Sequence, residues 1–377
     1  MKKVIYLIDT LQTGGAEKSI LEFSSRFTKV KSIVCFLQKK EGDLSPEFRA
    51  KNVELIDLSI PTSTFWFFHA IKAFNQVLQQ HQPDIVHAHL FKSELVARLS
   101  KIPKNTILVG AFVNDSYSEE RYNEQNFIRN CKLNFIKWID KLTISKNNYI
   151  TTITKTIAAS NCSILNYPFE KTILIPRGRS KNDFQVSTTV YNQGDTFTFI
   201  IVARLLFRKG YLELIEAVQL LSQQIDIPFK IRVVGDGVDK MAIQKKVEDE
   251  QVSSFFEFLG TRKDVPLLLQ SAHCFVLPSH YEGQGGALVE AMFTGLPIIC
   301  SDIPVFSEQV ENQKEALLFE LKSPEKLSEK MKWVIEHYVE ARSLGVQARS
   351  KAEQNYDIDR IAEKTEDFYL DITSTQP

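Results

Sequence analysis

The chain alternates short apolar runs with amphipathic stretches, and this alternation limits the folds it can adopt. In the first half, the runs of strand length are VIYLID, SIVCFL, VELIDL, DIVHAH, TILVGAF, YITTIT and TILIP. Stretches with helical spacing, such as AEKSILEFSSRF and ELVARLS, lie between several of them. Strands that are apolar throughout are typical of a parallel sheet covered by helices on both faces. The first half therefore predicts a doubly wound α/β domain.

The same alternation restarts after a polar interval at residues 178–195. Strands are expected at FTFIIVA, IRVVGDG, FFEFLG, HCFVLPS and LPIICSD, and helices at YLELIEAVQLLSQQ, from about Asp239 and after HCFVLPS. The sequence from PEKLSEK onward is predicted to be helical throughout. We therefore predict two doubly wound, Rossmann-like domains, residues 1–185 and 186–355, that face each other across a cleft.

Charge and cysteine content exclude several classes of protein. Lysine plus arginine equal aspartate plus glutamate at 46 each, so no global field favours nucleic acid, and a bound anion needs a local site. The five cysteines form no C-x-x-C pair, which favours free thiols in a reducing cytosol over disulfides or zinc. No apolar run reaches the roughly 18 residues of a membrane span, and Asp9 interrupts the apolar amino terminus. We expect a cytoplasmic protein.

Two loops after predicted strands carry glycines or cations suited to an anion. Gly14 and Gly15 follow the first strand and open a helix, whose amides and dipole favour an anion; a plain connecting turn explains them equally well. After the first strand of the second half, Arg204 and Lys209 converge on a helix terminus, an arrangement that suits a diphosphate. Arg208 lies beside them and could belong to the same cluster or equally be a solvated surface charge.

The segment HYEGQGGALVEAMFTGLPIIC places two carboxylates around a glycine loop. Glu282 follows a strand, the loop opens a helix near Gly285 or Gly286, and Glu290 lies about one turn into it. Both carboxylates can accept hydrogen bonds from hydroxyls while glycine amides hold a phosphate, so a polyhydroxy ligand with a phosphate fits. In the simpler alternative, Glu282 only caps the helix and Glu290 is only a solvated residue of that helix.

Paired carboxylates also occur in glycosidases, as acid and as nucleophile or base. A hydrolase has no need of a basic phosphate loop, however, and this chain has Arg204, Lys209 and two glycine loops. The residues therefore favour a phosphate-bearing sugar as the donor.

Taken together, these motifs resemble the retaining GT-B glycosyltransferases of family 4, also called glycosyl transferases group 1. The resemblance rests on TGGAEKSIL, DIVHAHL, ARLLFRKG, GDG at residues 235–237 and EGQGGALVEAMFTGLPIICSD. It implies transfer of a sugar from a UDP- or GDP-sugar to a glycan or lipid-linked acceptor, without a metal ion or a cofactor. The expected setting is the synthesis of surface polysaccharide or glycoconjugate, such as lipopolysaccharide or capsule. It also implies that residues 356–377 form a helix that returns to the first domain.

The resemblance further implies roles for individual residues. Glu290 would hold the ribose hydroxyls, Glu282 would lie by the donor sugar, and Arg204 and Lys209 would neutralise the diphosphate. Gly14 and Gly15 would approach the phosphates or the acceptor from the first domain. The other residues counted with the donor site are Gly235, Gly283, Gln284, Gly285, Gly286 and Ala287.

The chain departs from the family pattern at three places. Gln284 replaces the usual aromatic residue of E-G-F-G, which suggests a changed donor-sugar preference. Where many relatives have a histidine, this chain has Asn114 and Asp115, weak candidates for the acceptor side. Arg177 stands where relatives have asparagine, and it either adds charge to the cleft or reaches solvent. His89, at a strand end, is a further acceptor-side candidate.

Two aromatic stretches raise the question of a membrane. FIRNCKLNFIKWIDKLTISK mixes Phe127, Ile128, Phe135, Ile136, Trp138 and Ile139 with four basic residues. It either lies on an anionic membrane surface at the inner face or packs against the amino-terminal sheet, and we favour packing. The run Phe65–Phe68 is undecided between the same two uses.

Two other functions remain open alongside the transferase. A GT-B epimerase would turn over a nucleotide sugar with no acceptor present. A nucleotide-sugar-binding protein without transferase activity would bind and not react.

Overall fold

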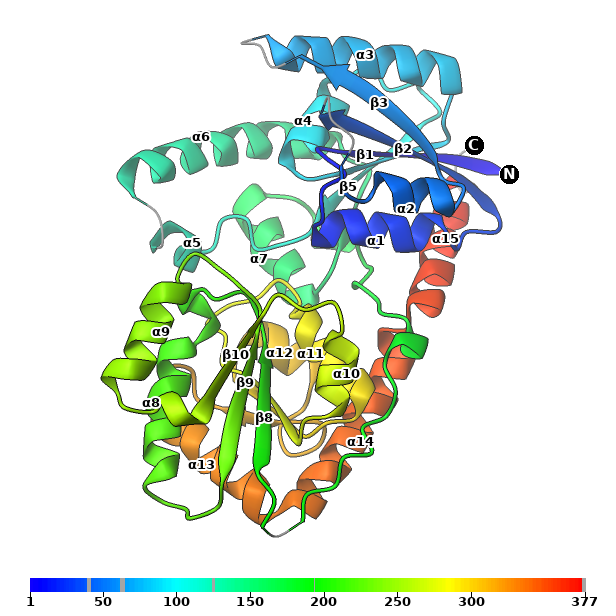
Figure 1. Ribbon diagram of the computed structural model, residues 1–377. Helices are drawn as coiled ribbons and strands as arrows, with labels where there is room; N and C mark the ends of the chain where they lie inside the picture. The colour runs from blue at the N-terminus through cyan, green and yellow to red at the C-terminus, as the bar shows by residue number, and fades with distance from the viewer. Residues whose placement is uncertain (39–41, 62–64, 124–125, 193, 375–377) are drawn as a thin grey trace. The chain divides into compact units, whose positions relative to one another are not determined.

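The chain folds into two compact units, each with a sheet of its own (Figure 1). The computed structural model describes residues 1–38, 42–61, 65–123, 126–192 and 194–374. Unit 1 comprises Met1–Gly178 and Ile358–Pro377, and unit 2 comprises Arg179–Asp357. The chain thus leaves unit 1 after residue 178 and returns to it at residue 358.

Unit 1 contains, within its described residues, a seven-stranded sheet in the order β3-β2-β1-β4-β5-β6-β7. All of its pairings are parallel. The strands are β1 (Lys2–Ile8), β2 (Val30–Gln38), β3 (Glu54–Ile60), β4 (Ile85–His89), β5 (Ile107–Phe112), β6 (Tyr149–Thr152) and β7 (Thr172–Leu174). Each of the seven apolar runs of the first half forms one of these strands. The interiors of β1, β4 and β5 are buried, because helices cover both faces of the sheet.

The helices of unit 1 follow the strands in alternation. They are α1 (Gly15–Ser24), α2 (Ser45–Ala50), α3 (Trp66–His81), α4 (Phe91–Leu99), α5 (Glu119–Asn123), α6 (Phe127–Thr143) and α7 (Lys155–Leu165). The last helix of the chain, α15 (Ile358–Ser374, red in Figure 1), belongs to this unit and packs against α1. The hydroxyl of Tyr369 on α15 lies 2.6 Å from Nδ1 of His87 and 2.8 Å from the hydroxyl of Tyr6, so a buried polar network holds α15 to the sheet.

Unit 2 repeats the architecture. Its described residues form a six-stranded sheet in the order β10-β9-β8-β11-β12-β13, also parallel throughout. The strands are β8 (Phe197–Val202), β9 (Phe229–Val234), β10 (Phe256–Gly260), β11 (Cys274–Leu277), β12 (Ile298–Ser301) and β13 (Leu317–Phe319). The helices are α8 (Tyr211–Ser222), α9 (Lys240–Asp249), α10 (Val265–Gln270), α11 (Gly286–Thr294), α12 (Pro304–Gln309), α13 (Pro324–Glu336) and α14 (Tyr338–Asn355).

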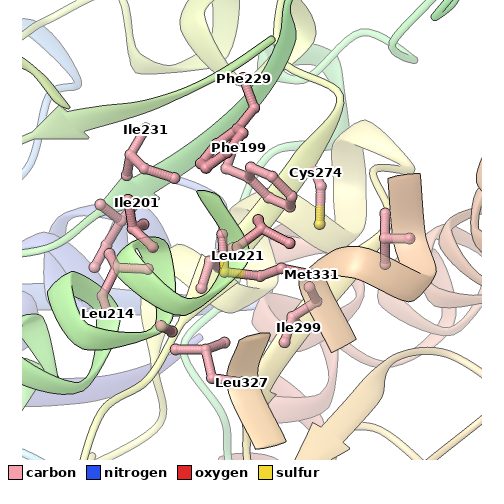
Figure 2. Close-up of a cluster of buried hydrophobic side chains, with 14 of the residues drawn as sticks. Phe199, Ile201, Leu214, Leu221, Phe229, Ile231, Cys274, Ile299, Leu327 and Met331 are labelled. Atoms are coloured by element: carbon pink, nitrogen blue, oxygen red, sulfur yellow. The ribbon is translucent and has the colours of Figure 1, made fainter. Parts of the chain in front are cut away.

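The core of unit 2 lies on both faces of this sheet. Figure 2 shows one face, where side chains of β8 and β9 meet those of α8 and α13. The labelled residues include Phe199, Ile201, Ile231, Leu214, Leu221, Leu327 and Met331. The other face is covered by α11, whose Leu288, Val289 and Met292 are buried. Because β8 and β11 are neighbours, the loops that follow them lie at the same edge of the sheet.

Helix α6 corrects one expectation from the sequence. The structure does not pack its main apolar stripe against the sheet: Phe127, Ile128, Phe135 and Trp138 are all exposed. Of the six apolar residues expected to pack, Ile136 and Ile139 are partly buried, and Ile136 packs against a core cluster of unit 1. The inward face of the helix also carries Leu133 and Asp140, and Asp140 forms a buried ion pair with Arg98 of α4. A polar pair thus occupies part of the position where the sequence suggested apolar packing.

The aromatic run at the start of α3 is divided between surface and core. Phe65 and Phe68 are exposed, whereas Trp66 and Phe67 are partly buried and pack against one of the cores of unit 1.

Candidate functional site

The loop after β8 brings three cations to the carboxyl edge of the unit 2 sheet. Arg204 is exposed, Arg208 lies 4.8 Å from the ring centre of Tyr281, and Lys209 is buried. Burial lowers the pKa of the Lys209 ammonium, the Glu282 carboxylate opposes this, and the charges of Arg208 and Arg204 lower it further. Arg204 and Arg208 thus lie near enough to Lys209 for their charges to affect its pKa.

A close approach of two loops places Lys209 against Glu282. Gly210 has a φ of +73°, and a Cβ there would lie 1.9 Å from the main-chain oxygen of Pro278, so the β8 loop touches the β11 loop. Lys209 Nζ forms an ion pair with Glu282 Oε1, and Ser279 Oγ donates to the same oxygen at 3.0 Å. Glu282 is therefore held in place by Lys209 and Ser279 and is not a solvated helix cap.

The glycine loop of the segment 282–290 opens α11 as the sequence predicts. Gly285 adopts a φ of +72°, and a Cβ there would lie 2.7 Å from Cε1 of Phe306. Gly286 is the first residue of the helix, and Glu290 follows one turn later with its side chain 19% exposed. The free amides at the start of α11 and the carboxylate of Glu290 therefore lie along one face, suited to a ligand with both anionic and hydroxyl groups.

The remaining donor-side candidates differ in their surroundings. Gln284 is buried, and its main-chain oxygen accepts a hydrogen bond from Nε2 of Gln309. Gly283 and Ala287 are half-buried beside it. Gly235 has a φ of +142°, and a Cβ there would lie 2.0 Å from the oxygen of Ala203, so this glycine permits close packing of two strand ends.

Arg179 is a site residue that sequence reasoning did not single out. Its Nε donates to Oε1 of Glu290 at 2.8 Å, and an ideal Cβ on Gly286 would lie 2.6 Å from its Nη2. The guanidinium thus spans one turn of α11, from the first glycine to the carboxylate. The available signal was a basic residue next to a glycine after the strand TILIP.

Two histidines occupy different settings at the carboxyl edges of the two sheets. In unit 2, His280 Nε2 lies 2.8 Å from Glu213 Oε1. In unit 1, His89 is buried, and within the described residues neither of its ring nitrogens has a hydrogen-bond partner. Burial is the main reason that the pKa of His89 falls to about 3, and the charge of Arg177 adds to it. His89 lines a cavity of about 20 Å³, room for a single water molecule.

The glycine loop of unit 1 carries its own charges. α1 begins at Gly15, where a Cβ would lie 2.5 Å from Nη1 of Arg177. A Cβ on Gly14 would lie 2.3 Å from Oε2 of Glu17, and burial raises the pKa of that carboxyl. A carboxylate and a guanidinium of unit 1 therefore already border the predicted anion loop.

The two other acceptor-side candidates take part in local hydrogen bonds. Asn114 accepts from Ser116 Oγ at 2.7 Å, and its main-chain oxygen accepts from Asn161 at 3.0 Å. Asp115 accepts from Ser160 Oγ at 2.9 Å. These bonds order the loop after β5.

In the part of the chain that the structure describes, no cluster of three or more histidine, cysteine, aspartate or glutamate side chains is arranged to bind a metal ion. None of the described helices is long and apolar enough to cross a membrane.

Comparisons with known proteins cover both units. The family model described as Glycosyltransferase Family 4 matches residues 13–181, and the model described as Glycosyl transferases group 1 matches residues 188–351. CapH, a capsular polysaccharide biosynthesis glycosyltransferase of Staphylococcus aureus, is 25% identical over 318 residues, covering 82% of this chain and 83% of CapH.

Two further matches bear on lipid-linked acceptors and on the fold. A UDP-Gal:alpha-D-GlcNAc-diphosphoundecaprenol alpha-1,3-galactosyltransferase of Escherichia coli is 26% identical over 314 residues, covering 79% of this chain and 78% of the enzyme. The crystal structure of Anabaena Alr3699/HepE in complex with UDP superposes with a TM-score of 0.81 at 17% identity, covering 98% of this chain and 100% of that chain. This likeness shows that the two chains share a fold.

Proposed function

The chain belongs to the glycosyltransferases of family 4 and has the GT-B fold, and on this premise we propose that it transfers a sugar from a nucleoside diphosphate sugar to a glycan or lipid-linked acceptor. UDP is the first candidate for the nucleotide, because the Escherichia coli relative uses UDP-Gal and HepE binds UDP, and GDP is the second. The observation that carries the proposal is that the Lys209–Glu282 ion pair lies directly before the glycine loop that opens α11, the helix that carries Glu290.

Each group has a role in this reaction. Lys209 and Arg204 with the amides of Gly285 and Gly286 stabilise the charge that develops on the departing diphosphate, as fixed donors do without reorganising. Glu290 accepts hydrogen bonds from the ribose hydroxyls, and Glu282 lies beside the sugar. Because these cations and amides can supply the charge stabilisation, we propose that the reaction needs no metal ion.

We propose that the anomeric configuration is retained by a front-face reaction. The bond from the anomeric carbon to the diphosphate breaks, and the bond to the acceptor oxygen forms on the same face. The acceptor proton passes to the departing diphosphate, so no enzymic nucleophile takes part. A covalent sugar adduct trapped on Glu282 would contradict this route.

Nucleotide binding is the direct test of the site. Thermal unfolding of the wild type and of Glu290→Gln is measured with UDP, GDP, ADP and their common sugars. A ligand at about 100 times its dissociation constant adds about 2.7 kcal/mol to the free energy of unfolding, an easily resolved shift. We expect one nucleotide to stabilise the wild type and to stabilise the variant much less.

Product analysis separates transfer from its alternatives. With the nucleotide sugar alone, an epimerase produces a new sugar, whereas a transferase releases at most a little free sugar by hydrolysis. With a diphosphoundecaprenol-linked sugar added, transfer produces an extended lipid-linked glycan, and proton NMR of the new linkage reports the anomeric configuration. Binding without either product would establish a sugar-nucleotide-binding protein instead. Activity that survives EDTA supports metal independence, and activity restored only by added Mg²⁺ contradicts it.

We further propose that unit 1 meets the acceptor at an anionic membrane surface through α6. Successive helical residues are rotated by about 100°, so the exposed apolar side chains of α6 fall within a single arc of about 100°. They are Phe127, Ile128, Phe135, Trp138 and Leu142, each between 59% and 81% exposed. An arc that faces solvent and carries this much apolar surface is typical of a helix that lies in a membrane interface.

The charges around this arc specify the kind of membrane. Lys132 and Lys141 flank the arc on either side, and Arg129 and Lys137 follow further around the helix. The sequence of α6 contains one acidic residue, Asp140, and it is buried in its pair with Arg98. Each basic residue near an anionic leaflet contributes about 1 kcal/mol, so Lys132 and Lys141, which border the arc, favour anionic lipid over neutral lipid.

Vesicle flotation tests this docking. We expect the wild type to float with vesicles of phosphatidylglycerol at low salt and not with vesicles of phosphatidylcholine alone. Phe135→Ser with Trp138→Ser should abolish flotation, whereas Val339→Ser with Val346→Ser, which removes apolar residues of α14 that are at least as exposed, should not. A wild type that stays at the bottom of the gradient has no such membrane role. If the α6 variant instead changes the oligomeric state in solution, the arc is an interface between copies of the chain.

A further inference from the structure

The start of α11 has an arginine beside it, and the Nε of this arginine pairs with Glu290 one turn further along the helix. The amino terminus of a helix has partial positive charge, so a cation beside it is unfavourable unless an anion is also present. Arg179 Nη2 nevertheless lies next to the position that a Cβ on Gly286 would occupy, at 2.6 Å. Glu290 compensates the charge of the guanidinium through Nε, and an external anion at the helix terminus would stabilise the Nη end as well.

The backbone around Arg179 is anchored within unit 2. The amide of Arg179 donates to the main-chain oxygen of Tyr356 at 2.9 Å, and the same residue forms an isolated parallel bridge with Asp357. Phe184, a few residues later, stacks on Phe293 of α11 with ring centres 6.1 Å apart. The guanidinium is therefore presented from a fixed point against α11, with its side chain 32% exposed.

The pairing with Glu290 leaves that carboxylate able to bind a ligand. Arg179 Nε donates to Oε1, whereas an ionised carboxylate has about four acceptor positions on its two oxygens. Glu290 can therefore accept from ribose hydroxyls while it keeps Arg179 in place. The same guanidinium has Nη2 at the helix terminus, where a phosphate would be bound by the free amides.

We propose that Arg179 is a donor-binding residue that recognises the diphosphate: Glu290 orients its guanidinium through Nε, and the Nη end contacts phosphate at the amino terminus of α11. One side chain then joins the part of the site that holds the ribose to the part that holds the phosphates. This inference rests on the proposed function of the site. It adds a cation of the segment after β7 to the cations of the β8 loop.

The test compares ligands that differ only in phosphate. Binding of UDP, UMP and uridine, and of the guanosine series, is measured by calorimetry for the wild type, Arg179→Gln and Arg179→Lys. Loss of a charge-assisted hydrogen bond to phosphate should weaken UDP or GDP about 10-fold or more. The nucleoside should be affected far less, so that the preference for diphosphate over nucleoside falls. Lysine, which keeps the charge and loses the planar fork, should recover part of that preference.

A matched variant controls for the loss of an arginine from unit 2. Arg232 on β9 pairs with Glu257 through its Nε at 3.2 Å and has a similarly exposed side chain, 29%. Arg232→Gln should leave the affinities for all of these ligands unchanged. Thermal unfolding without ligand shows whether each variant is folded.

A double-mutant cycle with Gly286→Ala tests the geometry itself. The added Cβ would force Nη2 of Arg179 to move, while the amide of the residue stays in place. If Arg179 contacts the phosphate, Gly286→Ala should weaken diphosphate binding in the wild type and should have a much smaller effect in Arg179→Gln. An equal effect in both backgrounds means that the Cβ obstructs the ligand directly.

Three results would overturn the inference. Unchanged UDP and GDP affinity in Arg179→Gln means that the guanidinium does not contact the donor. Tighter binding means that Arg179 occupies the ribose position and must leave it. An equal loss for the nucleoside and the diphosphate means that Arg179 acts only through Glu290. A wild type that binds no nucleotide at all is a different outcome, because it contradicts the proposed function before Arg179 is considered.

Discussion

Breaking the Lys209–Glu282 pair from one side should destabilise unit 2 strongly. The two side chains are only 10% and 12% exposed, so either partner left alone would be a nearly buried charge. Removing one partner of such a pair costs about 3–5 kcal/mol. For a domain of this size, each kcal/mol lowers the melting temperature by about 2–4 °C. Lys209→Met and Glu282→Gln should therefore each melt about 6–20 °C below the wild type.

The double variant separates the pair from its surroundings. Lys209→Met with Glu282→Gln leaves no uncompensated charge, so the double variant should be more stable than at least one of the single variants. The coupling energy between the two sites should be about 2 kcal/mol or more. Calorimetry at pH 7.5 without ligand measures all three variants. The exposed pair Lys314–Glu311, with side chains 54% and 64% exposed, is the control and should contribute under about 1 kcal/mol. Additive losses in the double variant would refute the reasoning, because they would mean that the two charges do not stabilise each other.

Three further predictions concern stability. Tyr369→Phe removes a hydroxyl that bonds to His87 and Tyr6, and the buried partners left unsatisfied should cost about 2–4 kcal/mol in urea denaturation. Because burial lowers the pKa values of His87 and His89, that of His89 to about 3, stability should be full above about pH 6.5 and fall below it, by up to about 1.4 kcal/mol per pH unit for each histidine. Urea denaturation between pH 7.5 and 5 should show a weaker dependence in His89→Asn. Gly210→Ala should lower the melting temperature more than any exposed glycine substitution, because its Cβ would meet a main-chain oxygen at 1.9 Å and its φ is positive.

The sequence predicted the strands well because both faces of each sheet are covered. Such strands are continuously apolar, and that signal does not depend on knowing which element packs where. The exception was β13, Leu317–Phe319, whose apolar run is closely followed by the long helical sequence that begins at Pro324. The helices α10 and α12 were missed because each has only six residues, too few to show helical periodicity.

The parts of the site that follow from local sequence were predictable, and those that follow from neighbouring strands were less so. Gly285, Gly286 and Glu290 lie within one loop and one helical turn, so their arrangement could be worked out from spacing. The ion pair between Lys209 and Glu282 joins residues 73 positions apart and exists because β8 and β11 are adjacent. Strand order of this kind is set by the packing of the whole unit and leaves no mark in either loop.

Helix α6 shows why an apolar stripe does not identify the buried face of a helix. The stripe was expected to face the sheet, yet the inward face carries Asp140, whose charge is compensated by Arg98 and whose other oxygen accepts from Tyr117 at 2.8 Å. Burying a charge is tolerated when it is paired and hydrogen-bonded, and pairing cannot be read from the helix alone. The partner lies on α4, which is distant in sequence.

Arg177 and Arg179 show that neighbouring residues of the same type can serve different units. Arg177 lies against Gly15, the first residue of α1, and Arg179 lies against Gly286, the first residue of α11. In each unit a guanidinium thus borders the positive end of a helix, and in each a carboxylate accompanies it, Glu17 in unit 1 and Glu290 in unit 2. The partial positive charge of a helix amino terminus repels a guanidinium, and the two together attract an external anion more strongly than either does alone. The repeated arrangement is therefore better explained by the binding of an anionic ligand than by the stability of either helix.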